Sequence, residues 1–268
     1  MSRIDNAFAA ARRQKRKALV IYLTAGDPDH DTSRRLMLAA AEAGADILEV
    51  GVPWSDPSAD GPVIQAAMLR ALKAGGGLRR TLELCRELRD ANPDVGLVMF
   101  GYANPLVVMG PEQFAARAKE AGVDGVLCVD WPPDEDRELV LALRAKGLDL
   151  IPLLAPTSTP ARIAAAAEAA SGFLYYVSLT GITGAQLANL EEPRRRVEEI
   201  RRATAGRLPV AVGFGIATPE EARTVADFAD GVVVGSRAIR IVADATAAGR
   251  DPVPELAAYV RSLRAAIG

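Results

Sequence analysis

The sequence is poor in the residues that build disulfide frameworks and metal centres. Its 268 residues include two cysteines, Cys85 and Cys128, and one histidine, His30. Cys85 falls in a helical pattern and Cys128 in an apolar strand pattern, which predicts two buried free thiols in a reducing compartment. His30 lies in a polar loop among aspartates, with no second ligand at metal-binding spacing. We therefore expect His30 at the surface and no metal site.

Long apolar runs and an excess of basic charge are also lacking. No run approaches the roughly 20 apolar residues that span a bilayer. The N-terminal basic residues follow the first Ala-rich stretch instead of preceding it, unlike those of a signal peptide. The net charge is −2, whereas dedicated nucleic-acid-binding proteins usually carry a basic face. We expect a cytoplasmic protein that binds neither membranes nor nucleic acid.

Half of the residues are hydrophobic, and they recur in short apolar runs along the whole chain. Such nearly continuous runs are typical of parallel strands that are covered on both faces. They predict eight strands, at residues 18–24, 46–51, 95–100, 125–129, 149–154, 173–178, 209–214 and 231–236. Segments with helical spacing lie between them, at 32–43, 111–121, 134–146, 160–170 and 219–229, and several begin with Gly or Thr before a proline.

Strict alternation of eight strands with helices predicts a (βα)8 TIM barrel, an α/β fold, as one domain over residues 1–268. Residues 2–15 predict an extra N-terminal helix that covers the N-terminal end of the barrel, with Ile4, Phe8 and Ala11 on one face. A doubly wound open sheet is the alternative. It more often has five or six strands and a G-x-G-x-x-G turn after the first, which this chain lacks.

Two acids follow each other at the predicted second strand, where the active site of a barrel lies. Glu49 sits inside the apolar strand with no basic residue near it in sequence, and burial of such a carboxylate raises its pKa toward the range of a general acid–base. The alternative for Glu49 is an ion pair with a distant arginine. Asp60 follows in a proline-rich loop, and its alternative role is the N-cap of the next helix.

Glycine-rich loops follow three consecutive strands, at 180–184 (TGITG), 213–216 (GFGI) and 235–237 (GSR). Glycines let backbone N–H groups approach an anion closely, and barrels often bind phosphate after strands seven and eight. The sequence therefore predicts a phosphate site at this end of the barrel.

The five lysines are placed away from the C-terminal ends of the predicted strands, which argues against a Schiff-base mechanism. A Ser-His pair can be built only from His30. Proton transfer by carboxylates on a phosphorylated substrate is the chemistry that remains.

Six segments in colinear order resemble the tryptophan synthase α subunit family: 22–28 (YLTAGDP), 48–62 (LEVGVPWSDPSADGP), 102–105 (YANP), 155–157 (APT), 181–184 (GITG) and 212–216 (VGFGI). The resemblance covers nearly the whole chain. It implies a (βα)8 barrel with an added N-terminal helix that cleaves indole-3-glycerol phosphate to indole and glyceraldehyde 3-phosphate by a retro-aldol reaction.

The resemblance also implies a role for particular residues. Glu49 is expected to deliver a proton to the indole ring carbon, Asp60 to hold the indole N–H, and Tyr175 to be a further catalytic candidate. The implied phosphate ligands are Gly184, Gly213, Gly235 and Ser236, and the implied pocket and loop residues are Tyr22, Thr183 and Phe214.

A pyridoxal-phosphate β subunit is the partner that the resemblance implies, in an α2β2 heterotetramer, so no cofactor is assigned to this chain. The residues expected at the interface are Asp56, Pro57, Asn104 and Pro132. The chain departs from the family pattern at 129–132 (VDWP), at Phe100-Gly101 and at Arg237, which puts partner affinity more in question than catalysis.

Two rival functions stay open at this point. One is a lyase that releases indole without a partner, and the other is a subunit that only activates a partner enzyme. A related barrel, indole-glycerol phosphate synthase, would need a lysine at the barrel mouth.

Overall fold

A parallel β-sheet forms the centre of the molecule in the computed structural model, which describes residues 1–131, 137–177, 190–213 and 215–268. In these residues the strands are hydrogen-bonded in the order β5-β4-β3-β2-β1-β9-β8-β7-β6. Their bounds are β1 Ala18–Thr24, β2 Ile47–Gly51, β3 Gly96–Gly101, β4 Gly125–Cys128, β5 Asp149–Leu150, β6 Leu153–Leu154, β7 Leu174–Val177, β8 Val210–Gly213 and β9 Gly231–Val234. Nearly all strand residues are buried, as the continuous apolar runs predict.

The sheet closes on itself through one extended segment. Residues 149–154, predicted as a single strand, pair with β4 at their start, as β5, and with β7 at their end, as β6. Ile151 donates its N–H to Val126, while Tyr175 donates to the carbonyl of Pro152 at 3.2 Å. Pro152 has no N–H to give to a ladder, so the strand is interrupted there. The predicted closed barrel is confirmed, with this interruption as a correction.

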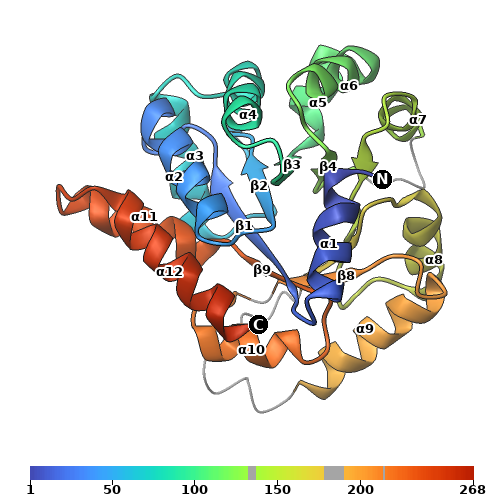
Figure 1. The fold of residues 1–268 in the computed structure, drawn as a ribbon. Helices are drawn as coiled ribbons and strands as arrows, with labels where there is room; N and C mark the ends of the chain where they lie inside the picture. Colours follow the sequence, from blue (N-terminus) through green and yellow to red (C-terminus); the bar gives the residue numbers. More distant parts are fainter. Residues whose placement is uncertain (132–136, 178–189, 214) are drawn as a thin grey trace.

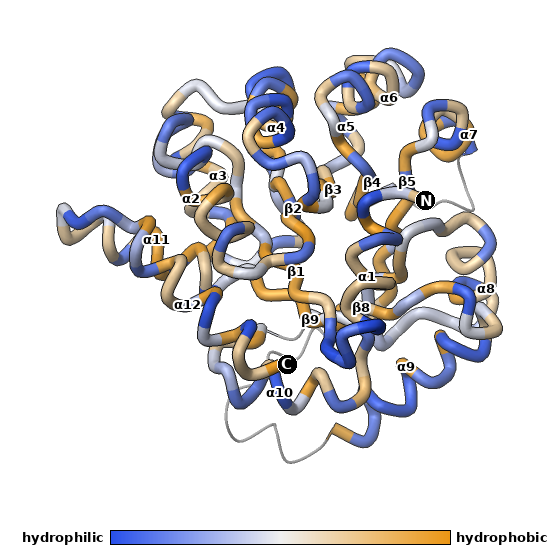
Figure 2. The backbone as a smooth tube through the Cα atoms, viewed as in Figure 1, coloured by the Kyte–Doolittle hydropathy of each residue, from blue (hydrophilic) through white to orange (hydrophobic). Residues whose placement is uncertain are grey.

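Helices surround the strands, with polar residues concentrated on their outer faces (Figures 1 and 2). In the described residues they are α1 Arg3–Arg13, α2 His30–Glu42, α3 Pro62–Lys73, α4 Leu78–Ala91, α5 Ala103–Met109, α6 Pro111–Glu120, α7 Glu138–Ala145, α8 Pro160–Ala169, α9 Glu191–Ala203, α10 Pro219–Ala226, α11 Ser236–Ala247 and α12 Pro252–Ala266. The threonines before Pro160 and Pro219 both cap their helices, as predicted.

The N-terminal helix α1 covers the N-terminal ends of the strands, as predicted (Figure 1). Ser2 caps it with a reciprocal hydrogen bond to Asp5. Ile4 and Phe8 point into the barrel end, where the Phe8 ring lies 5.4 Å from the ring of Phe173. These buried side chains fill the N-terminal end, which leaves the opposite end for the active site.

The structure differs from the prediction at His30, which was expected in a polar loop before α2. The Asp29 side chain accepts the N–H of Thr32, so the helix begins at His30, two residues earlier than predicted. The imidazole Nε2 lies 3.1 Å from a carboxylate oxygen of Glu87 on α4 and is partly shielded from solvent. His30 is therefore a helix residue and not a loop residue, and its partly exposed side chain has a carboxylate partner at the surface.

Candidate active site

Glu49 lies near the C-terminal end of β2, between Tyr22 of β1 and Val98 of β3 in the sheet register. Its exposure is 1%, and its Oε1 has no hydrogen-bond partner in the described residues. Burial raises the pKa of Glu49 from 4.5 to about 8, and among the described residues no cation pairs with it to oppose that shift. The alternative of an ion pair with a distant arginine therefore finds no support. Glu49 holds a proton at neutral pH.

Asp60 lies in the loop between β2 and α3. It is not the N-cap of α3: that position is taken by Gly61, because Pro62 is the first helical residue. Its carboxylate accepts a hydrogen bond of 2.6 Å from the hydroxyl of Tyr102. Burial raises the pKa of Asp60, and the hydrogen bond from Tyr102 opposes this rise.

Tyr102 is the residue that sequence reasoning missed. It follows β3 and is 2% exposed. A signal was present, since Tyr102 opens the segment 102–105 that carries part of the family resemblance. A single sequence, however, gives no sign that a side chain of one loop reaches a carboxylate of another.

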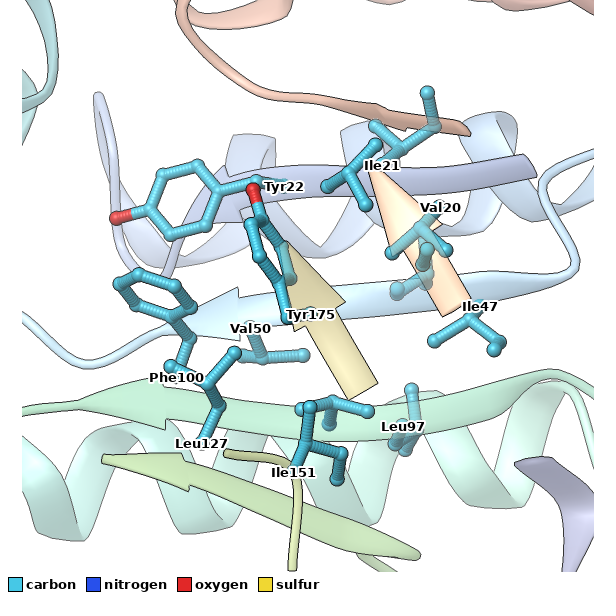
Figure 3. Packing of buried hydrophobic residues seen from close by; sticks show 14 of the residues in the cluster. Val20, Ile21, Tyr22, Ile47, Val50, Leu97, Phe100, Leu127, Ile151 and Tyr175 are labelled. Carbon is cyan, nitrogen blue, oxygen red and sulfur yellow. The ribbon is translucent and has the colours of Figure 1, made fainter. Parts of the chain in front are cut away.

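Aromatic side chains line the interior at the C-terminal ends of the strands. Figure 3 shows Tyr22, Phe100 and Tyr175 near one another, while Ile47 and Leu97 lie deeper in the barrel. The Tyr22 and Phe100 rings meet edge to face with centroids 5.1 Å apart. This arrangement suits a flat apolar ligand.

Two tyrosines and the two acids lie close enough to interact electrostatically. Burial raises the pKa of Tyr175, and the negative charges of Glu49 and Asp60 raise it further. The same three causes raise the pKa of Tyr22, whose hydroxyl lies 3.3 Å from that of Thr24. The structure thus brings together four of the predicted residues, from β1, β2, β7 and the loop after β2.

Two of the predicted phosphate loops lie side by side, because β8 and β9 are paired. Gly213 ends β8, and a side chain there would overlap the hydroxyl of Tyr175. Gly235 follows β9 as the N-cap of α11, with no side chain to satisfy the first helical N–H groups. The exposed Ser236 is the first residue of that helix. Free N–H groups at a helix N-terminus suit an anion.

Several predicted residues lie outside the described part of the chain: Thr183, Gly184, Phe214 and Pro132. Of the other residues predicted for the partner interface, Asp56 and Pro57 belong to the loop after β2, whereas Asn104, predicted in a loop, lies in the first turn of α5. Asp56 and Asn104 are exposed and Pro57 is partly exposed.

Within the described ranges, no group of three or more histidine, cysteine or acidic side chains is placed to hold a metal ion. In the same ranges, no helix is long and apolar enough to cross a membrane.

Comparison with known proteins places this barrel in one family. Residues 8–268 match the family described as "Tryptophan synthase alpha chain". The tryptophan synthase alpha chain of Burkholderia thailandensis is 50% identical over 267 residues, which cover all of this chain and 97% of that protein. The corresponding protein of Zymomonas mobilis is 46% identical, with the same coverage.

Solved structures agree with the sequence matches. The tryptophan synthase subunit alpha of Legionella pneumophila superposes with a TM-score of 0.92 at 38% identity, over all of this chain and 98% of that one. Tryptophan synthase from M. tuberculosis in an aminoacrylate-bound form gives 0.89 at 34% identity, over the whole of both chains. The chain belongs to the tryptophan synthase alpha chain family.

Proposed function

We propose that Glu49 and Asp60 carry out the reaction of this family in the present chain, with separate tasks. Tryptophan synthase alpha chains are carbon–carbon lyases that cleave indole-3-glycerol phosphate to indole and glyceraldehyde 3-phosphate. The observation that carries the assignment is the burial of Glu49 at the active-site end of the barrel, with no described partner for its Oε1. A buried, unpaired carboxyl group with a pKa of about 8 is a proton donor at neutral pH.

In the proposed mechanism Glu49 adds its proton to carbon 3 of the indole ring. The ring nitrogen then carries the positive charge, and the carboxylate of Asp60 accepts a hydrogen bond from its N–H. The side-chain hydroxyl of the substrate returns a proton to Glu49, and the substrate carbon that bears this hydroxyl becomes the aldehyde carbon. The electrons of the broken carbon–carbon bond return to the ring, which leaves as indole. The ring itself is the electron sink, so the chain needs no lysine for this step.

The remaining residues are proposed to bind the substrate. Gly213, Gly235 and Ser236 offer backbone N–H groups and a hydroxyl to the phosphate at the N-terminus of α11. Tyr22 and Tyr175 are proposed to contact the indole ring and the reacting side chain, and this is supported by their burial beside both acids. Thr183, Gly184 and Phe214 keep their proposed roles from the family resemblance.

A β subunit that carries pyridoxal phosphate is the proposed partner, in an α2β2 heterotetramer, and no cofactor is assigned to this chain. The exposed Asp56 and Asn104 support this interface, because the loop after β2 and the first turn of α5, which carry them, both follow strands at the active-site end of the barrel. Pro57 and Pro132 are proposed to belong to it as well. We also propose a cytoplasmic location, which the two free, buried cysteines support.

The test is the release of indole from indole-3-glycerol phosphate, with and without the β subunit. We expect Glu49→Gln to abolish release while leaving the chain folded, and the exposed Glu120→Gln to leave it unchanged. Full turnover by the Glu49→Gln variant would overturn the mechanism. Stimulation of the β subunit by a chain that releases no indole would instead favour a subunit that only activates its partner.

A further inference from the structure

The hydroxyl of Tyr102 makes two hydrogen bonds to the loop that carries Asp60. It lies 2.6 Å from Oδ2 of Asp60 and 3.1 Å from the backbone nitrogen of Ala59. The Ala59 N–H is a donor, so the phenol oxygen accepts from it. The single phenol proton is then left for the carboxylate, which fixes the direction of the shorter bond.

Tyr102 itself is anchored in the barrel, whereas its two partners lie in a more exposed loop. The preceding residue, Gly101, pairs with Cys128 of β4, and the following N–H, of Ala103, donates to Asp130 at 2.7 Å. Ala59, in contrast, is exposed. The contact between Tyr102 and Asp60 spans 42 positions and joins the loop after β2 to the end of β3.

In this geometry the two carboxylate oxygens of Asp60 differ in their hydrogen bonding. Oδ2 is taken by Tyr102, while no described residue donates to Oδ1. Oδ1 is therefore the oxygen available to a substrate N–H. A hydrogen bond from a neutral phenol also favours the ionised carboxylate over the acid, which is the form that accepts an N–H.

We propose that Tyr102 is a positioning residue for Asp60, which orients the carboxylate toward the indole N–H and keeps it ionised. The inference rests on the proposed role of Asp60 in the reaction. Tyr102 itself does not need to touch the substrate. The other titratable groups that interact with Asp60 are Tyr22 of β1 and Tyr175 of β7, and Asp130 interacts with Tyr102 itself.

The experiment compares Tyr102→Phe with Tyr259→Phe in the full chain, with the β subunit present. Tyr259 is the control, because its hydroxyl also donates a hydrogen bond, of 3.2 Å to the carbonyl of Ala217, but on the outer helix α12. We expect Tyr102→Phe to lower kcat/KM by roughly 10- to 100-fold, the range for a lost hydrogen bond to a charged group.

The acidic limb of the pH profile of Tyr102→Phe should move to higher pH, because the bond that lowers the pKa of Asp60 is gone. Tyr259→Phe should leave that limb in place.

Two further measurements separate positioning from a merely structural role. Introduced into Asp60→Asn, Tyr102→Phe should cause little additional loss, because the carboxylate that Tyr102 orients is already absent. The pKa of Asp60, followed by carboxyl NMR without substrate, should be higher in Tyr102→Phe than in the unaltered chain. An unchanged pKa together with an unchanged acidic limb would overturn the inference, as would losses that simply add. The NMR measurement needs no catalysis, so it remains decisive if the proposed function fails.

Discussion

Replacing Glu49 by glutamine is expected to stabilise the fold in a pH-dependent way. Burial raises the pKa of Glu49 from 4.5 to about 8. Between these values the unfolded chain has released the proton that the folded chain keeps, so this group lowers stability as the pH rises from 4.5 toward 8. With about 1.36 kcal/mol for each pKa unit, the loss is about 1 kcal/mol at pH 5, about 3 kcal/mol at pH 7 and about 4 kcal/mol at pH 8. Glutamine has nearly the same shape and does not ionise, so this loss disappears.

The assay is unfolding in urea and on heating, followed by circular dichroism at pH 5 and pH 8. The stability of Glu49→Gln relative to the unaltered chain should increase by about 3 kcal/mol between these values. For a chain of this size that is roughly 6–12 °C in Tm. The matched control is Glu120→Gln, since Glu120 is exposed and should give the same difference at both values.

The result that refutes the reasoning is an identical pH dependence of stability for Glu49→Gln and the unaltered chain. It would mean that Glu49 is ionised in the folded chain at neutral pH. Glu49 could then not be the proposed proton donor, and the predicted stabilisation would also be wrong. The pH dependence of unfolding therefore tests both predictions.

Three further outcomes follow from the same contacts. The basic limb of the kcat/KM profile should lie near pH 8, because activity falls as Glu49 loses the proton that it donates. Gly213→Ala should destabilise the chain by about 1–3 kcal/mol in urea unfolding, since the new methyl group overlaps the Tyr175 hydroxyl, and adding Tyr175→Phe should recover part of that loss. Asp124→Asn should cost about 3–5 kcal/mol in the same assay, because it leaves the largely buried Arg89 unpaired.

Local patterns in the sequence were sufficient for the strands other than the interrupted fifth one, and for the burial of Glu49. A strand of a closed parallel barrel is buried on both faces, so its residues are apolar one after another, and each run can be read without knowing its neighbours. Glu49 interrupts such a run, and its burial follows from the strand that contains it. The capping role considered for Asp60 fails for an equally local reason, because a proline in the first helical position places the cap at Gly61.

Contacts between distant segments were not predictable in this way. Nothing near Tyr102 in sequence indicates that it reaches Asp60, because the contact depends on how the ends of β2 and β3 come together. The interruption of the fifth predicted strand also depends on its surroundings. Pro152 is compatible with an extended chain, and the loss of its N–H matters only because both edges of the segment are paired.

Asp124 and Glu49 are buried carboxylates at opposite ends of the barrel, and they differ in their partners. Asp124, at the N-terminal end, is 5% exposed and fully engaged: it accepts the N–H of Leu97 and pairs with Arg89 and Arg3. Removing any of these donors makes the fold less stable, so stability alone accounts for an acid at that position. Glu49, at the other end, is more deeply buried, and no described donor reaches its Oε1. Its burial lowers the stability of the fold at neutral pH without a described bond to Oε1 that compensates, as expected if the proposed reaction requires a proton at that point.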